Sequence, residues 1–258
     1  MNKLPPVMAL CLLLSIFTPV RAQSWDGTGS SYGIKTSLGF EYFQRTVSLG
    51  ENTDNPTEMK NMIFHLGADY YFQENISMGV FIGYALSSFE QVIFRELPFS
   101  LQLNKENLTG ILGGVRFSAG SLHLSQFELK GSGQFVYFIG SEQNWDISGL
   151  AEAGDAAGKS DWMRVAAGPV IWYTEPLLFS PYLGVQFNYL WGTYSMEESI
   201  GNLSGSEEKK FQSKSYVSLA AGGIYRLTPG LEISAGADLI PSEKGVDFGI
   251  MLNIAYIF

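Results

Sequence analysis

The chain ends in the thirteen residues VDFGIMLNIAYIF (Val246 to Phe258), which alternate without interruption between large apolar side chains and smaller or polar ones. Successive side chains of a strand point to opposite faces, so this period of two places every second residue on one face. The apolar face carries Val246, Phe248, Ile250, Leu252, Ile254, Tyr256 and Phe258. Chain ends usually fray and are polar. The segment therefore predicts a strand that is held in a sheet and turns one apolar face toward lipid.

The first 22 residues have the features of a signal peptide. Lys3 supplies a positive charge, residues 7–20 form a short apolar run, and Ala22 offers a small residue for cleavage. The run is shorter than the roughly 20 apolar residues of a spanning helix. We expect residues 1–22 to be removed and residues 23–258 to form a single domain. The only cysteine, Cys11, leaves with the signal, so the mature chain has neither disulfides nor thiolate metal sites.

The mature chain is both apolar and acidic. Apolar residues make up 46% and aromatic residues 14% of the sequence, and the mean hydropathy is +0.07. Without Lys3 and Arg21, 14 basic residues stand against 25 acidic ones. The negative surplus argues against nucleic acid as a partner. So much apolar surface suits an exported protein when the apolar residues face lipid on alternate positions.

The same alternation recurs upstream and predicts ten strands. They cover residues 32–48, 61–73, 76–89, 106–117, 122–139, 161–174, 179–192, 213–227, 230–239 and 246–258. Short turns at 73–75, 118–121, 175–178 and 228–230 alternate with longer polar loops at 49–60, 90–105, 140–160 and 193–212; the last upper connection, 240–245, is short. We therefore predict an all-β fold, a closed antiparallel up-and-down transmembrane β-barrel of ten strands. If a weak strand such as 230–239 is absent, the count becomes eight.

Charged residues test which face of each strand meets lipid. In the strand bodies they fall on the parity opposite to the apolar residues, six positive and six negative: Lys35, Glu41, Arg45, Asp69, Arg116, Glu128, Lys130, Arg164, Arg226, Glu232, Asp238 and Asp247. An Arg or Lys on the lipid face at mid-depth costs roughly 2 to 4 kcal/mol. A bilayer enforces this segregation, whereas a soluble sandwich would place the charged face outside. The remaining acidic surplus lies in the loops, for example at Glu197 and Glu208.

The chain resembles the small outer-membrane β-barrel superfamily that includes OmpA-like, OmpX-like and opacity-type proteins. The resemblance rests on the signal peptide, the amphipathic strands and the terminal strand that ends in Tyr256-Ile257-Phe258. It implies a location in the bacterial outer membrane and an assembly signal at Tyr256 and Phe258 that the barrel assembly machinery reads. Outer-membrane lipids and lipopolysaccharide are then expected partners. Many members of the superfamily have eight strands, whereas this chain predicts ten.

The inward charges are expected to form a network inside a largely filled lumen, because a ten-stranded barrel encloses little more than its own side chains. Unpaired charges there are costly, so we expect cations such as Lys35 and Arg164 to pair with Glu41, Asp69 or Glu232. The expected lumen network is Lys35, Glu41, Asp69, Glu128, Lys130, Arg164, Glu232, Asp238 and Asp247. Aromatic residues gather where strands cross the interfaces, with Trp162, Tyr189 and Trp191 in the upper girdle.

Few residues suggest catalysis. His65 and Asp69 share an inward face, which favours a satisfied polar residue of the lumen over an acid-base pair. The sequence His123-Leu124-Ser125 superficially resembles the His-x-Ser of outer-membrane lipid A deacylases, but the surrounding motif is missing and the residues follow a lower turn. We therefore expect no enzyme activity, no cofactor and no metal.

Several functions fit these features. The leading hypothesis is a non-enzymatic barrel whose acidic external loops act in surface recognition, adhesion or envelope integrity. A narrow pore for small solutes or ions is the alternative, and a lipid A hydrolase using His123 and Ser125 is a weaker one. A soluble lipocalin-like barrel would need an apolar interior. The sequence names no extracellular ligand.

Overall fold

The structure is a computed structural model that describes residues 33–50, 56–73, 76–98, 100–103, 106–147, 154–174, 178–243 and 245–258, except for the side chains of residues 121 and 123. The expected signal peptide lies outside these residues. The described strands are β1 (Gly33–Leu49), β2 (Pro56–Gln73), β3 (Ile76–Phe89), β4 (Val92–Phe94), β5 (Leu101–Leu103), β6 (Asn107–Leu124), β7 (Phe127–Gly140), β8 (Gln143–Ile147), β9 (Gly154–Tyr173), β10 (Phe179–Ile200), β11 (Leu203–Ser213), β12 (Val217–Thr228), β13 (Leu231–Ser242) and β14 (Gly245–Ile257). In this part of the chain, no helix is long and apolar enough to cross a membrane.

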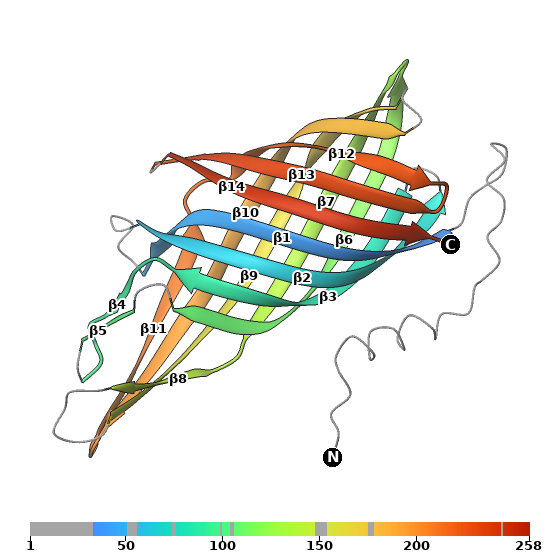
Figure 1. Cartoon of the computed structure of the whole chain (residues 1–258). Helices are drawn as coiled ribbons and strands as arrows, with labels where there is room; N and C mark the ends of the chain where they lie inside the picture. The colour runs from blue at the N-terminus through green and yellow to red at the C-terminus, as the bar shows by residue number, and fades with distance from the viewer. Residues whose placement is uncertain are drawn as a thin grey trace, which may run out of the picture.

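The strands close into a barrel through antiparallel pairing (Figure 1). One hydrogen-bonded circuit runs β1-β2-β3-β6-β7-β9-β10-β12-β13-β14 and returns to β1, where Lys35 to Gln44 pair with Ile257 to Phe248. This circuit contains the ten segments that the sequence predicts as wall strands. The described residues hold 14 strands in all, because β4, β5, β8 and β11 lie in segments that the sequence predicts as loops. The predicted barrel fold is confirmed.

A second circuit closes the upper end of the barrel, which is the end that carries β4, β5, β8 and the β10–β11 turn. There β10 leaves β12 after Phe187 and pairs with β11 from Trp191 onward. The strand β11 in turn pairs with the last residues of β1, Val47 to Leu49. At this end β11 thus takes the place of β12, β13 and β14. The upper circuit runs β1-β2-β3-β6-β7-β9-β10-β11. The point at which β10 exchanges β12 for β11 is called the fork below.

Several predicted boundaries are wrong. The predicted turn at 118–121 lies inside β6, which continues to Leu124, and the chain turns at Ser125, whose φ is +56°. The predicted polar loops at 140–160 and 193–212 are largely strands, since β9 begins at Gly154 and β10 extends to Ile200. Water covers the outer face of these upper segments, so their outward residues are polar and hide the strand pattern.

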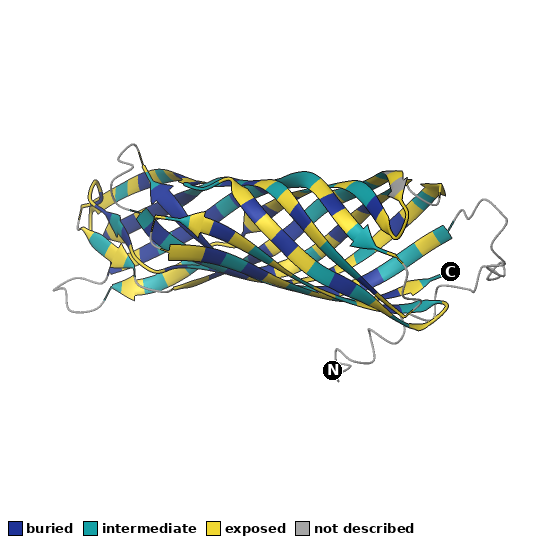
Figure 2. Ribbon diagram, turned by 90° about the horizontal axis from the view of Figure 1, so that it is seen from above, coloured by how far each residue is buried: buried dark blue, intermediate teal, exposed yellow. Residues whose placement is uncertain are grey.

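The predicted inward and outward faces are confirmed. Buried and exposed residues alternate along the strands, as the blue and yellow blocks of Figure 2 show. On β3, Ile82 is 69% exposed, whereas the next inward residue, Phe81, is 4% exposed. The exposed apolar side chains form an apolar belt around the barrel that includes Leu38, Phe64, Leu66, Val80, Ile111, Leu183, Val185, Leu219, Ile250, Leu252 and Ile254. All twelve charges of the strand bodies lie on the inward side, buried or partly buried.

Candidate functional site

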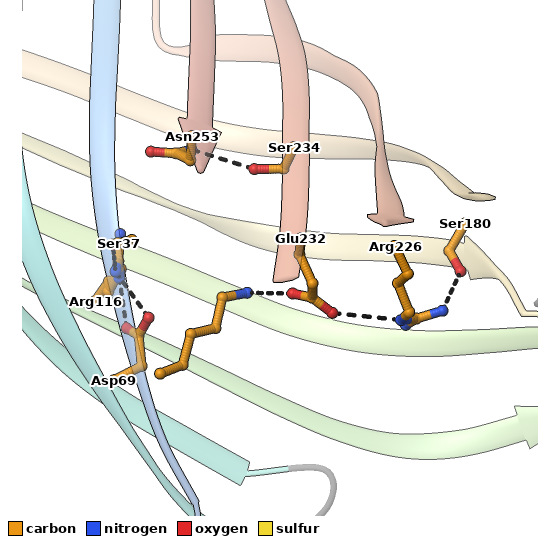
Figure 3. Close-up of polar contacts among 9 residues, drawn as sticks. Ser37, Asp69, Arg116, Ser180, Arg226, Glu232, Ser234 and Asn253 are labelled. Carbon is orange, nitrogen blue, oxygen red and sulfur yellow. Dashed lines mark hydrogen bonds and ion pairs between the residues drawn. The ribbon is translucent and has the colours of Figure 1, made fainter. Parts of the chain in front are cut away.

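The lower lumen, at the end that carries the C-terminus, is lined by ion pairs (Figure 3). Glu232 on β13 joins two cations from nearby strands of the wall: it accepts a hydrogen bond from Lys35 Nζ at 2.8 Å and another from Arg226 Nε at 3.3 Å. Arg226 also donates to Ser180 Oγ at 3.2 Å. Inward charges from three strands therefore meet, although Arg226, which the expected network did not include, is needed to complete the group.

Two further ion pairs join β6 to β2 and β9 to β1. Arg116 donates to both carboxylate oxygens of Asp69, at 2.5 and 2.7 Å, and to Ser37 Oγ at 2.8 Å. Arg164 makes a bidentate pair with Glu41, and its Nη2 donates to Oε2 at 2.9 Å. The Arg164 pair is buried, so the two parallel hydrogen bonds of its guanidinium compensate for the loss of water around both charges.

The remaining residues of the expected network play different parts. Lys130 pairs with Glu128 on its own strand at 2.9 Å. Asp247 binds backbone instead of a cation: it accepts hydrogen bonds from Thr46 N at 2.7 Å and Thr46 Oγ1 at 2.8 Å. This contact lies where β1 leaves β14, so Asp247 satisfies an amide that the strand pairing abandons. Asp238 faces the lumen on β13, and no ion pair joins it to another described residue.

The upper lumen differs from the lower one because it is filled with apolar side chains. Trp162, with no exposed surface, stacks on Phe138 at 5.1 Å between ring centroids and meets the edge of Phe43 at 5.8 Å. Its indole Nε1 donates to Ser87 Oγ at 3.0 Å. The prediction that Trp162 belongs to the aromatic girdle is therefore wrong. This upper core also contains Val47, Met59, Phe89, Leu108, Leu112, Val136, Leu190, Tyr194, Met196 and Phe211.

The β4–β5 hairpin packs against the top of the upper core, although the sequence predicts residues 90–105 as a polar loop. Val92, Phe94 and Leu97 are buried, and Phe94 meets the edge of the Tyr194 ring at 5.3 Å between centroids. The hairpin therefore packs over the upper core at the mouth of the barrel. The sequence signal was the apolar alternation Val92-x-Phe94, which is too short to stand out.

A charged pair on β11 holds the hairpin in place. Glu207 accepts a hydrogen bond from the backbone N of Glu96 at 2.7 Å and forms an ion pair with Lys209, whose Nζ lies 5.6 Å from the centre of the Phe94 ring. Burial raises the pKa of the Glu207 carboxyl, but the Lys209 ammonium and the backbone donors outweigh this effect and hold the pKa below its ordinary value. Glu207 is therefore charged at neutral pH.

The structure describes only part of the residues considered for catalysis. His65 is buried in the lumen, where its ring lies 5.2 Å from the Phe81 ring between centroids. The side chain of His123 lies outside the described residues, although its backbone pairs with Glu128 on β7. Ser125 sits in the following turn in a left-handed conformation. Among the described residues, no group of three or more His, Cys, Asp or Glu is placed to hold a metal ion.

The C-terminal strand takes the predicted place in the wall. Tyr256 is exposed at the lower edge of the apolar belt, and its ring meets the Phe258 ring at 4.8 Å between centroids. Phe258 N donates to Ile34 O at 2.9 Å, so the last residue is bonded to the first described strand. Recognition of Tyr256 and Phe258 by the assembly machinery stays a prediction.

A closed sheet has no free edge within the apolar belt, so its backbone groups are satisfied without water. Apolar side chains cover the outside of this closed sheet, and the ionised ones lie inside. The chain is an integral outer-membrane β-barrel. The soluble alternative is excluded, because it would place the exposed apolar belt in water. The lower end, with the short turns and the C-terminus, faces the periplasm, and the upper end faces the exterior.

No family model matches the chain, and neither does any characterised protein sequence. Solved structures of outer-membrane proteins resemble it distantly. The outer-membrane protease OmpT of Escherichia coli is 12% identical, with 91% of this chain and 100% of that chain covered and a TM-score of 0.43. OprG of Pseudomonas aeruginosa is 10% identical (89% and 98% covered, TM-score 0.39), and Ail of Yersinia pestis is 15% identical (88% and 100% covered, TM-score 0.35). Resemblances this distant carry no inference about what the chain binds or does.

Proposed function

We propose that this barrel is a non-enzymatic, non-conducting surface protein that presents a rigid acidic recognition surface outside the membrane. The observation that carries the proposal is the continuation of the wall above the apolar belt. There β8, β11 and the upper parts of β9 and β10 (residues 154–161 and 192–200) form one hydrogen-bonded sheet over the upper core, here called the upper extension. At about 3.3 Å per residue, residues 192–200 alone cover about 30 Å along the strand.

The outer face of the upper extension carries carboxylates at adjacent positions. Asp146 on β8 lies directly opposite Asp155 on β9, and Glu197 on β10 lies opposite the outward Ala157. All three acidic residues are exposed. Like charges directly opposite each other destabilise a sheet. Their presence at the outer tip supports a role in binding a basic partner.

Adhesion of intact cells tests the recognition surface. Cells that display the wild-type barrel are compared with cells that carry Asp146→Asn, Asp155→Asn and Glu197→Gln together, on surfaces coated with poly-lysine or with neutral dextran. We expect the triple variant to lose the barrel-dependent adhesion to poly-lysine, and added salt to weaken the wild-type adhesion. The matched control neutralises Glu90, Glu106 and Glu142, which are also exposed at the upper end but lie outside the upper extension. Equal losses in both triple variants would contradict a defined recognition surface.

The non-conducting part of the proposal has its own test. The upper core fills the lumen across Phe43, Phe138 and Trp162, and the β4–β5 hairpin covers it. This packing favours a non-conducting barrel instead of a pore. We expect the purified barrel to be electrically silent in planar lipid bilayers. Stepwise single-channel currents from the wild-type protein would favour the narrow pore instead.

A further inference from the structure

Four aromatic side chains gather on the outer wall at the fork. Phe187, Tyr189 and Trp191 occupy successive outward positions of β10, and Tyr216 directly precedes β12. The Tyr189 ring lies 5.1 Å from that of Trp191 and 5.4 Å from that of Tyr216, and Phe187 lies 6.1 Å from Tyr216, all between centroids. Phe187 is 50% exposed and Tyr216 is 41% exposed. These four residues are called the fork cluster.

The fork cluster differs from an ordinary aromatic girdle. Within the fork cluster, the planes of Tyr189 and Trp191 differ by 20°, and those of Phe187 and Tyr216 by 19°. Two nearly parallel ring pairs therefore lie side by side on the wall. Elsewhere on the outer wall, rings meet in pairs at Phe40–Phe64, Tyr42–Phe248, Tyr70–Phe72 and Tyr256–Phe258.

Polar and cationic groups border the upper side of the fork cluster. Gln212 on β11 lies directly opposite Trp191 and accepts a hydrogen bond from the Tyr189 hydroxyl at 2.9 Å. Lys210 is two residues further along the same strand, a diagonal position about 7 to 8 Å from Trp191. Lys210 is exposed, and no described carboxylate pairs with it.

A second cation stands on the other side of Gln212. Lys214 forms an ion pair with the exposed Glu243 at 2.8 Å. The side chain of Lys214 is 16% exposed and that of Glu243 is 67% exposed, so solvent reaches the pair from the Glu243 side, where another anion can take the place of the carboxylate. The neighbouring acid Asp161 is held by Lys159 at 3.1 Å, and Glu208 is the next outward residue above Lys210. The fork therefore combines aromatic faces with two cations that can meet a ligand.

We propose that the fork cluster binds the phosphorylated sugar headgroup of an outer-leaflet glycolipid. The fork lies at the upper boundary of the apolar belt, since Leu183 and Val185 continue the same strand face below it and Lys210 lies above it. Amphipathic aromatic rings favour this interface. The near-parallel rings offer flat surfaces to the apolar face of a sugar ring, Lys210 and Lys214 meet its phosphate, and the acyl chains run down over Leu183 and Val185.

The test measures lipid binding to the whole barrel in phosphatidylcholine nanodiscs by native mass spectrometry. The probes are rough-type lipopolysaccharide, the same lipopolysaccharide after dephosphorylation, phosphatidylglycerol and inorganic phosphate. The variant is Trp191→Ala with Lys210→Glu. The control is Tyr42→Ala with Lys60→Glu, because Tyr42 and Lys60 occupy the same diagonal arrangement on β1 and β2, where Lys60 is already paired with Glu58.

We expect the fork variant to bind lipopolysaccharide about tenfold more weakly than wild type, and the control variant to bind it like wild type. Dephosphorylation should lower wild-type binding, and the fork variant should not respond to it. Equal binding by both variants would overturn the proposal, as would an equal loss for phosphatidylglycerol or competition by millimolar inorganic phosphate. If the double variant does not fold, as judged by heat-modifiable gel migration, Lys210→Gln alone carries the same comparison with Lys60→Gln.

Discussion

The lower and upper halves of the lumen are filled by different kinds of side chains. Inward positions of the lower half carry ion pairs such as Lys35 with Glu232 and Arg116 with Asp69, and several of these side chains keep contact with water, as Arg226 does with 37% of its side chain exposed. Inward positions of the upper half carry the upper core, in which Trp162 and Phe94 have no exposed surface. The change occurs along single strands: on β9, Arg164 and Trp162 are consecutive inward residues.

The difference shows that the bilayer dictates only the outer face of the barrel. Lipid requires an apolar exterior, but either a satisfied polar lumen or a close-packed apolar one is compatible with it. Above the belt the exterior meets water, so the wall there buries its apolar residues inward like a soluble β-sheet protein. We therefore expect the upper half to respond to mutation as a soluble core does and the lower half as an ion-pair network does.

Truncation of the upper core should have the largest effect. Trp162→Ala removes a fully buried ring and the hydrogen bond to Ser87, and should lower the free energy of unfolding by about 4 kcal/mol. Urea titration of the barrel in lipid vesicles, followed by heat-modifiable gel migration, measures this loss. Trp172→Ala is the matched change in the lower lumen, where the ring is only partly buried. Equal losses at the two positions would contradict the contrast between the halves.

Breaking the buried ion pair between Arg164 and Glu41 should have the second largest effect on stability. Arg164→Leu leaves Glu41 charged and buried, which should cost about 3 kcal/mol in the same urea titration. The double variant Arg164→Leu, Glu41→Leu removes both charges and should recover most of the loss. A double variant that is as unstable as the sum of the single ones would show that the pair is not the source of the stability.

The attachment of the β4–β5 hairpin should depend on pH. The pKa of Glu207 is lowered below its ordinary 4.5 in the folded barrel, so its contribution is complete above pH 4.5 and is lost as the pH falls through the lowered value. Glu207→Gln should cost about 1 to 2 kcal/mol at neutral pH, because it weakens the bond to Glu96 N and removes the ion pair with Lys209. Hydrogen exchange of residues 92–103, corrected for its intrinsic pH dependence, reports the opening. Wild-type protein that protects the hairpin equally at pH 3 and pH 7 would refute this role.

The smallest effect should come from the lower lumen. Lys35→Met removes one of the two cations on Glu232, but Arg226 remains paired with that carboxylate. Because Arg226, whose side chain is 37% exposed, keeps the carboxylate paired, we expect a loss of less than about 1 kcal/mol in the urea titration. A loss as large as that of Arg164→Leu would mean that the lower network is as tightly constrained as the buried pair.

The sequence predicts the barrel and the two faces of its wall. Alternation alone separates the outward Ile82 from the inward Phe81, and the twelve charged residues singled out in the strand bodies lie on the inward parity. This works because the bilayer penalises a charge on the outer face along the whole belt. The alternation also places cations and carboxylates from distant strands in one lumen. Parity alone does not identify pairs such as Arg164 with Glu41.

The upper half is harder to predict because its outer face meets water instead of lipid. Tyr194, Met196 and Ile200 point inward on β10, but the outward residues between them are polar and the inward Glu198 interrupts the apolar face, so the segment resembles a loop. Trp162 shares its parity with Arg164, a signal for the lumen that outweighs its nearness to the interface. The fork cluster joins Tyr216 to residues of β10 through a change of strand partners, which no local pattern encodes.

The hydrogen bonds from Thr46 to Asp247 depend on the register between the first strand, β1, and the last strand, β14. A slip of one residue between the first and last strands would turn Asp247 outward and leave the Thr46 amide without an acceptor. The same slip would leave the first strand's short contact with β11 untouched, because Val47 to Leu49 pair with β11 independently of β14. Thr46 is therefore a register-specific contact of the seam: only the correct alignment of β1 with β14 gives its amide this bond.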